Sequence, residues 1–143
     1  MRFLHLADLH LGKSIYGTSL VDNDDQKVWV NRFLEKAREL KPDAVVIAGD
    51  VYDRGLPPGR AVQLLSFLVT SLADMEIPVL ITAGNHDPIY HLSCLSPLLK
   101  ARKVYISCPL EQSSELVHYT LADEHGRVTF WLLPYVYPAM AAQ

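Results

Sequence analysis

The sequence predicts an α/β fold, and three observations lead to that expectation. Short apolar runs without polar alternation recur up to residue 106, as in parallel strands that are buried on both faces. Segments with apolar residues at helical spacing separate these runs. Two alternating segments then follow, and such a pair is typical of an antiparallel hairpin. The order βαβαβα, a further strand and a hairpin indicates a parallel sheet with right-handed crossovers.

The first elements are a strand, a helix and a strand. Across the chain, four apolar runs are predicted to be strands: 2–7, 43–48, 79–83 and 104–106. The first helix, at 24–40, has Asn23 or Asp24 as a candidate N-cap, and Lys41-Pro42 ends it. Its predicted buried face carries the residues at i, i+4, i+8 and i+11, namely Trp29, Phe33, Ala37 and Leu40.

The later elements complete the pattern. A second helix is expected after Pro57-Pro58. It has an apolar stripe at helical spacing: Ala61, Leu64, Leu65, Leu68 and Leu72. A short third helix is predicted at 92–101. The hairpin is predicted from 116–121 and 128–133, with its turn near His125-Gly126.

Length and composition bound the class of protein. A chain of 143 residues with half of them hydrophobic fits one domain, 1–143, which buries roughly 68–70% of its unfolded surface. The net charge of −3 argues against a surface that coats nucleic acid, but divalent metals reverse the local sign in a carboxylate cleft. The sequence shows no signal peptide and no apolar stretch of membrane length, so we expect a cytoplasmic protein without membrane contact. Cys94 and Cys108 have no zinc spacing and are expected to be buried or partly buried free thiols.

Metal-type side chains follow three of the predicted strands. Asp8 and His10 follow the first, Asp50 the second, and Asn85 and His86 the third. Because ligands bind outside the carboxyl ends of the strands in an open α/β sheet, these side chains could converge on one cleft. Carboxylate, imidazole and amide groups suit manganese, iron, magnesium or zinc, and one carboxylate can bridge two ions about 3.5–4 Å apart. Asp-x-His and Gly-Asp are weak signals alone, and Gly-Asn-His-Asp is stronger but could be a strand-exit turn. Together, in this order, they predict a phosphate-ester hydrolase built on a metal pair.

The same motifs carry a resemblance to a known family. They are Ala7-Asp8-Leu9-His10-Leu11-Gly12, Ala48-Gly49-Asp50-Val51-Tyr52-Asp53 and Gly84-Asn85-His86-Asp87. Together they resemble the first half of the signature of the calcineurin-like metallophosphoesterases. Within that family they look most like the SbcD type of DNA repair exonuclease, the nuclease subunit of the bacterial SbcCD complex. The stretch 131–138 resembles the Leu-Pro-Tyr stretch of these proteins, so the resemblance covers essentially the whole chain.

The resemblance implies a ligand set. Asp8 and His10 would bind the first metal, Asp50 would bridge the two ions, and Asn85 would bind the second. The cofactor would be two divalent metal ions, Mn²⁺ above all, with Mg²⁺, Fe²⁺ or Zn²⁺ as alternatives.

The resemblance also implies a catalytic histidine and a reaction. His86 would contact the scissile phosphate and assist the leaving oxygen. A carboxylate usually fixes the tautomer of such a histidine, and Asp87 is a candidate for that support. The implied activity is hydrolysis of DNA phosphodiesters, of the double-strand exonuclease and single-strand endonuclease type, in DNA repair, recombination and replication. DNA and an SbcC-type ATPase would be the partners.

Two parts of the family's pattern do not occur in the sequence. A lone His and a Gly-His-x-His motif would complete both metal shells, and neither follows. Of the other histidines, we expect His5 in the core or half-buried and His91 in a solvated loop. His118 and His125 have no ligand spacing. We therefore expect the N-terminal half of a metallophosphoesterase sandwich, with an incomplete sheet, an incomplete second metal site and weak or no activity alone.

An incomplete sheet also suggests self-association. It exposes an edge and an apolar face, so a homodimer or an oligomer that exchanges elements is expected. The resemblance implies dimerisation through the helices after the second and third strands. The leucines of these helices could equally face the core.

Two other functions stay open. Gly49-Asp-Val-Tyr-Asp-Arg-Gly55 is close to a motif of serine/threonine protein phosphatases in which the arginine grips the phosphate, so Arg54 is a candidate phosphate ligand. Those phosphatases carry Gly-Asp-x-His-Gly and Gly-Asn-His-Glu where this chain has Ala-Asp-Leu-His-Leu and Gly-Asn-His-Asp, which favours the nuclease. The second alternative is a non-catalytic module that keeps the fold. The intact ligand residues argue against it.

Overall fold

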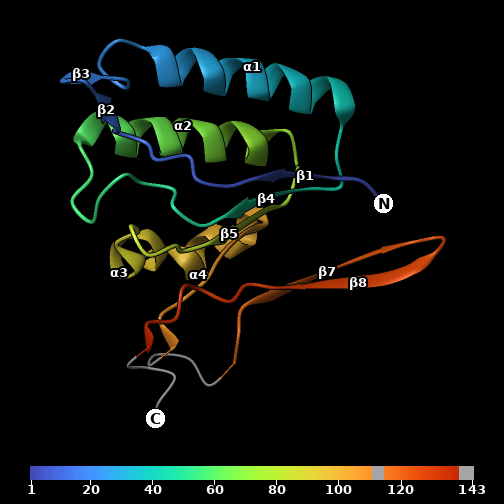
Figure 1. Cartoon of the computed structure of the whole chain (residues 1–143). Coiled ribbons are helices and arrows are strands. Elements are labelled where there is room, and N and C mark those ends of the chain that lie inside the picture. The colour runs from blue at the N-terminus through green and yellow to red at the C-terminus, as the bar shows by residue number, and fades with distance from the viewer. Residues whose placement is uncertain (111–114, 139–143) are drawn as a thin grey trace.

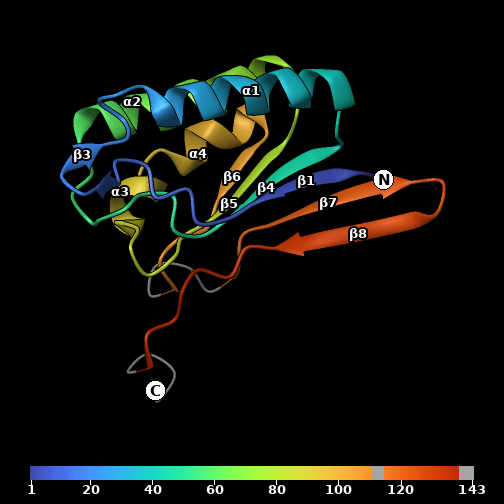
Figure 2. The ribbon, with the colours of Figure 1, turned by 45° about the horizontal axis from the view of Figure 1, so that its top comes forward.

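A four-stranded parallel sheet organises the chain in the computed structural model, which describes residues 1–110 and 115–138. Its strands are β1 (Phe3–Leu6), β4 (Ala44–Ala48), β5 (Val79–Thr82) and β6 (Val104–Ile106). They pair in the order β1-β4-β5-β6, so each strand lies beside the strand of this sheet that follows it in the sequence (Figures 1 and 2). All three pairings are parallel. The prediction of an α/β fold with a parallel sheet is confirmed.

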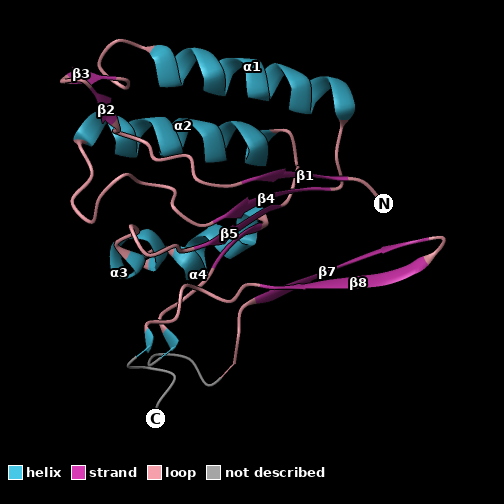
Figure 3. Ribbon diagram, viewed as in Figure 1, coloured by secondary structure: helices cyan, strands magenta, loops and turns pink. Residues whose placement is uncertain are grey.

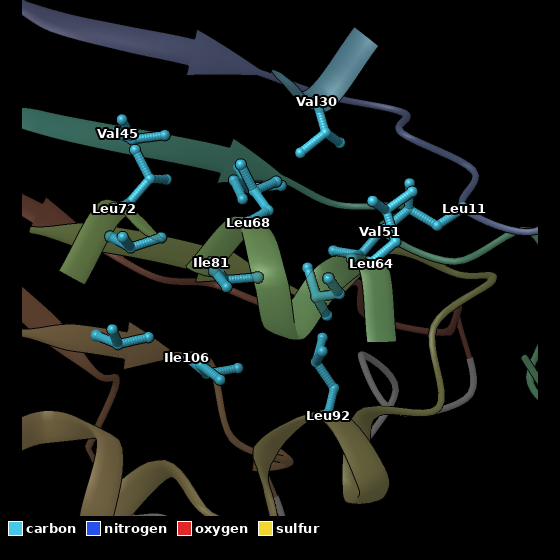
Figure 4. Close-up of a cluster of buried hydrophobic side chains, with 14 of the residues drawn as sticks. Leu11, Val30, Val45, Val51, Leu64, Leu68, Leu72, Ile81, Leu92 and Ile106 are labelled. Carbon is cyan, nitrogen blue, oxygen red and sulfur yellow. The ribbon is translucent and has the colours of Figure 1, made fainter. Parts of the chain in front are cut away.

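Two long helices, α1 (Asp25–Leu40) and α2 (Gly59–Asp74), cover one face of this sheet (Figure 2). Figure 3 shows the same helical layer in cyan above the strands. The predicted stripe of α2 is confirmed, since Leu68 and Leu72 are fully buried. In the core these leucines lie among branched side chains of the strands, such as Val45, Ile81 and Ile106 (Figure 4). The short helix α3 (Ile89–Ser93) adds Leu92 to the end of this core nearest the strand exits.

The buried face of α1 differs from the predicted one. Val30 and Leu34 point inward with Ala37, whereas Trp29 is 40% exposed and stacks on Phe33 with ring centroids 5.7 Å apart. Both sets have i, i+4 spacing, so periodicity alone allowed either. The aliphatic set faces the core, and the paired aromatics flank it at the surface.

The ends of α1 agree with the prediction only in part. Asp24 stands at the N-cap position, but it has a left-handed backbone (φ 63°) and makes no side-chain capping bond. The helix ends as expected at Lys41, which is left-handed (φ 46°) and donates its N–H to the carbonyl of Ala37 at 2.9 Å. Pro42 then prevents a further turn.

The predicted helix at 92–101 is broken. It consists of the end of α3, the short helix α4 (Ser96–Leu99) and a 3-10 turn, η1 (Lys100–Arg102). Pro97 lacks a backbone N–H, so it fits only the first turn of a helix and a new helix has to begin there.

The hairpin β7 (His118–Asp123) and β8 (Gly126–Trp131) is a separate two-stranded sheet. Each strand lies about two residues from its predicted place, and the loop is Glu124-His125. The hairpin packs on the face of the sheet opposite the helices (Figure 2). Two aromatic pairs join the hairpin to that face. The ring centroids of Phe130 and Phe3 are 5.3 Å apart, and those of Tyr119 and Tyr105 are 4.6 Å apart.

The face under the hairpin is only partly covered. Phe3 on this face is 46% exposed, and Trp131, on the hairpin itself, is 58% exposed. His5, which was expected in the core or half-buried, is exposed on β1, the edge strand of the sheet. Cys108 is partly buried as expected, but Cys94 is exposed, and both are free.

A small antiparallel ribbon, β2 (Ser14–Ile15) with β3 (Thr18–Ser19), was not predicted. Its loop residues Tyr16 and Gly17 both have positive φ, as the two-residue loops of hairpins often do. No helix in the described ranges, 1–110 and 115–138, combines the length and the apolarity that a membrane crossing needs.

Candidate metal centre

The loop after β1 runs beside the loop after β4. Their backbones are joined by hydrogen bonds from Asp8 N to Gly49 O at 3.2 Å and from His10 N to Asp50 O at 2.9 Å. A parallel bridge pairs Leu11 with Tyr52 just beyond them. The two motifs are therefore held in register by the main chain, as an extension of the β1–β4 pairing.

Asp8, His10 and Asp50 come together at this point. Each offers one ligand atom, and the three atoms lie within 4.8 Å of one another. His10 turns Nε2 toward Asp50, with 3.8 Å between Nε2 and Oδ2. Two donors on one ion, at about 2.0–2.2 Å each, are separated by no more than about 4.4 Å. Small side-chain adjustments would close this group on a divalent ion, so the donor set fits a metal.

The backbone at these three residues is left-handed. The φ angles are 54° at Asp8, 43° at His10 and 48° at Asp50. Asp and His tolerate this conformation better than most residues, but it still costs about 1–3 kcal/mol where the structure enforces it. Such conformations gather at functional sites, and here they turn three side chains from two loops toward one another.

Two glycines let the third loop approach the second. A Cβ on Gly84 would lie 2.0 Å from Asp50 Oδ1 and 2.3 Å from Asp50 N. A Cβ on Gly49, whose φ is 78°, would lie 3.2 Å from the Cα of Gly84. Asp50 Oδ1 accepts a hydrogen bond from His86 N at 3.2 Å. The Asp50 carboxylate therefore touches the loop of the third motif directly.

His86 stands next to this group. Its Nδ1 lies 2.9 Å from the backbone carbonyl oxygen of Asp53. Its ring meets the ring of His10 edge to face, with centroids 5.2 Å apart. Since a carbonyl oxygen only accepts, Nδ1 carries a proton, and Nε2 is the atom left for a substrate.

Asn85 is exposed at the rim of the site. Its backbone carbonyl accepts a hydrogen bond from the Tyr137 hydroxyl at 3.3 Å. Tyr137 belongs to the stretch after the hairpin, which is held to the third loop by a bond from Tyr135 N to Ala83 O at 2.8 Å. The role of Asn85 as a metal ligand stays a prediction.

The predicted support of His86 by Asp87 differs from what the structure shows. Asp87 is buried and accepts hydrogen bonds from three backbone N–H groups, at 3.1 Å from Val51, 2.8 Å from Tyr52 and 2.8 Å from Gly84. Burial raises the pKa of this carboxyl, while the three N–H donors act in the opposite direction. Asp87 therefore joins the second loop to the third, and the backbone of Asp53 supports His86.

Arg54, the predicted phosphate ligand, follows Asp53 and is exposed. It makes no ion pair within the described part of the chain. Its contact with a phosphate stays a prediction.

Sequence reasoning missed three polar residues that hold the site. Asp53 Oδ1 lies 3.4 Å from His10 Nδ1 and accepts a hydrogen bond from Lys13 Nζ at 3.1 Å. Gln26, in the first turn of α1, donates to the carbonyl of His10 at 2.9 Å and accepts from Gly12 N at 2.9 Å. Asp53 lies three residues after Asp50 in the second motif, which was a usable signal. Gln26 had none, because its contact depends on where α1 docks.

These loops, on this sheet, define a class of protein. Residues 1–136 match the family of calcineurin-like phosphoesterases. The chain belongs to that family.

Two known proteins are particularly informative relatives. Both are the SbcD component of the nuclease SbcCD, from Staphylococcus saprophyticus and from Staphylococcus epidermidis. The chain is 34% identical to the first and 33% identical to the second, over 136 residues in each case. Each comparison covers 94% of this chain and 34% of the relative. The chain thus spans about a third of the length of the curated relatives it matches.

Proposed function

We propose that this chain supplies the first metal ligands and the catalytic histidine of a metal-dependent nuclease that hydrolyses DNA phosphodiesters. One observation carries the proposal. Asp8, His10 and Asp50 converge within 4.8 Å, and the backbone N–H of His86 bonds the Asp50 carboxylate. The similarity to the staphylococcal nuclease subunits supports phosphodiesters as the substrate and SbcCD-type exonuclease and endonuclease chemistry as the reaction.

The chain's own groups suit two divalent ions, with Mn²⁺ as the proposed metal and Mg²⁺, Fe²⁺ or Zn²⁺ as alternatives. When bound, such a pair supplies a positive clamp for the attacking and leaving oxygens of a phosphoryl displacement. Asp8 and His10 would hold the first ion, Asp50 would be shared, and Asn85 would hold the second. The carboxylates and the imidazole are hard or borderline donors that suit these metals.

His86 would act on the substrate. The carbonyl of Asp53 would hold its Nδ1 proton in place, which leaves Nε2 for the scissile phosphate. Nε2 would first take up a second proton, so that the ring is an imidazolium, and would then hand that proton to the leaving oxygen and return to the neutral Nδ1–H form. A histidine is suited to this step because its pKa lies near neutral pH.

The second ion would have only Asp50 and Asn85 from this chain. We therefore propose that the 143-residue polypeptide binds metal weakly and turns over slowly or not at all by itself. In the cell it would act in DNA repair, recombination and replication in the cytoplasm, with an SbcC-type ATPase as partner, and it would self-associate.

Metal binding and turnover should separate in two variants. Asp50→Asn should lose Mn²⁺ binding, because it removes the bridging carboxylate. His86→Ala should keep nearly the wild-type affinity, because His86 is not a ligand, yet lose cleavage of a DNA duplex by the chain extended to the length of its relatives. Calorimetric titration with Mn²⁺ measures the first effect, and gel analysis of the products measures the second. Loss of Mn²⁺ affinity in His86→Ala would contradict the assignment.

Arg54 favours a second candidate, a phosphatase. Hydrolysis of a phosphomonoester and of a phosphodiester by the same extended protein distinguishes the two. A preference for the monoester that Arg54→Ala abolishes would favour the phosphatase. Absence of hydrolysis of both substrates with Mn²⁺ would favour a non-catalytic module.

A further inference from the structure

The two ring nitrogens of His10 face different groups. Nε2 faces the candidate ligands, 3.8 Å from Asp50 Oδ2. Nδ1 points the other way, is buried, and lies 3.4 Å from Asp53 Oδ1, at the limit of hydrogen-bond distance. Within the described part of the chain, Nδ1 is the buried side-chain polar atom without a hydrogen-bond partner. If Nε2 binds the metal, Nδ1 carries the proton and needs an acceptor.

Asp53 is held where its carboxylate can accept the Nδ1 proton of His10. Its backbone N–H donates to the carbonyl of Leu11 at 3.2 Å, so it is fixed directly beside the loop that carries His10. Its side chain is 19% exposed and that of His10 is 23% exposed, so both are largely shielded from competing water. A closer approach of a few tenths of an ångström would complete the hydrogen bond.

Lys13 holds the same carboxylate oxygen that faces His10. Its Nζ lies 3.1 Å from Asp53 Oδ1. Lys13 N also bonds the carbonyl of His10 at 3.0 Å, so the two residues belong to one tight turn. A lysine there offsets the repulsion between the carboxylates of Asp53 and Asp50, and it favours the pose in which Asp53 faces the imidazole and not the ion.

We propose that Asp53, held by Lys13, is a positioning residue that fixes the proton of His10 on Nδ1 and leaves Nε2 free for a divalent cation. A carboxylate behind a metal-binding histidine orients the ring and makes it a stronger ligand. Asp53 thus supports His10 with its side chain and His86 with its backbone carbonyl. The proposal rests on the metal centre proposed above.

The tautomer of His10 tests the proposal without any activity. In the metal-free full chain, nitrogen-15 NMR at a pH where the ring is neutral should show the proton of His10 on Nδ1. Asp53→Ala removes the acceptor and should move the proton largely to Nε2. Asp53→Asn keeps an oxygen that can accept and should restore part of the Nδ1–H form, which a purely structural role would not produce.

Metal affinity is the second measurement. Titration with Mn²⁺, followed by the EPR signal of the free ion, should show binding about 10- to 100-fold weaker in Asp53→Ala. Lys13→Gln should weaken binding less, since the side chain of Lys13 is 46% exposed and its charge is partly screened. The matched controls are Asp74→Ala and Lys36→Gln, which remove one partner of an exposed ion pair outside the site and should leave affinity and tautomer unchanged.

Two outcomes would overturn the proposal. One is a wild-type His10 with its proton on Nε2. The other is unchanged affinity and tautomer in Asp53→Ala, Asp53→Asn and Lys13→Gln, with the fold of each variant verified by its amide spectrum. An Nδ1–H tautomer in a wild-type chain that binds no Mn²⁺ would instead overturn the proposed metal centre, and with it the purpose of this positioning.

Discussion

In the three loops, the position of a single side chain is fixed by the groups that contact it. Asp50 is the clearest case, because its carboxylate faces His10 on one side and accepts the backbone N–H of His86 on the other. Its backbone N and its Oδ1 also lie against Gly84, where even one methyl group has no room. The ligand residue and the glycine therefore form one unit.

Gly84→Ala should disrupt the site more than the fold. Its new Cβ would lie 2.0 Å from Asp50 Oδ1 and 2.3 Å from Asp50 N, so the loop and the carboxylate must move. We expect a loss of about 1–3 kcal/mol in the free energy of unfolding, with Mn²⁺ binding lost, as measured by urea unfolding and calorimetric titration. Gly55→Ala is the matched control, since nothing lies within 4 Å of its new Cβ. Wild-type Mn²⁺ binding in Gly84→Ala would contradict this account.

Tyr52 makes the free energy of unfolding depend on pH in the alkaline range. Burial, and then the nearby charge of Asp87, raise the pKa of Tyr52 from 10.0 to about 12. The pKa of Tyr52 is thus higher in the folded chain than in the unfolded chain. Its contribution to the free energy of unfolding is therefore fully present below pH 10.0 and is lost as the pH rises through about 12.

The Tyr52→Phe variant isolates this contribution. The difference in unfolding free energy between wild type and variant should fall across the window from pH 10.0 to about 12, as measured by urea unfolding at a series of pH values. Tyr16→Phe, on a fully exposed ring, is the control. A difference that stays constant over the window would contradict the prediction.

At the scale of elements, helix α2 is the main support of the sheet. Its buried stripe lies over the branched side chains of β4, β5 and β6, and it starts where the loop after β4 ends. Gly12 packs so closely on Pro58 that a Cβ there would lie 2.9 Å from the proline ring. The start of α2 therefore also holds the end of the loop that carries His10.

Leu68→Ala should destabilise the fold strongly. Leu68 is fully buried at the centre of the stripe, so the truncation leaves a cavity and costs about 2–5 kcal/mol. Leu56→Ala removes the same atoms from a side chain that is 81% exposed and should change the free energy of unfolding by no more than about 0.5 kcal/mol. Urea unfolding followed by circular dichroism measures both. Equal effects of the two substitutions would show that α2 does not pack as described.

At the scale of the whole molecule, the two faces of the sheet differ. The helices cover one face, whereas the hairpin covers the other face only in part and leaves Phe3 of the sheet half-exposed. The hairpin itself carries a further exposed aromatic side chain, Trp131. Exposed apolar area of this kind favours association of chains.

We therefore expect the chain to self-associate as its concentration rises. Trp131→Glu should weaken the association, because it places a charge on the exposed side of the hairpin. Tyr16→Glu changes an exposed aromatic in the small β2–β3 ribbon, away from the hairpin (Figure 1), and should have no effect. Light scattering over a concentration series measures both, and a monomeric wild type at every concentration would refute the expectation.

Much of the fold was predictable because its signals are local. The apolar runs predicted all four parallel strands and the stripe of α2 within a few residues. The face of α1 was predicted only in part, since Ala37 is buried as expected but Trp29 is exposed, and the break before Pro97 was not predicted. In α1 two stripes one residue apart had the same period, and only packing could choose between them. At 92–101 the apolar pattern runs across Pro97, which cannot continue a helix.

The site shows the same division. The sequence alone determines the types of ligand side chain and their positions directly after buried strands, because composition and periodicity are properties of short segments. Only the tertiary structure decided which groups touch. Asp87 accepts hydrogen bonds from backbone N–H groups more than 30 residues away. The Nδ1 atom of His86 contacts the carbonyl of Asp53. The carboxylate of Asp53, which Lys13 also contacts, lies next to Nδ1 of His10. Such contacts depend on the register of β1 against β4 and of β4 against β5, and a shift of one residue in either pairing would turn every one of these side chains elsewhere.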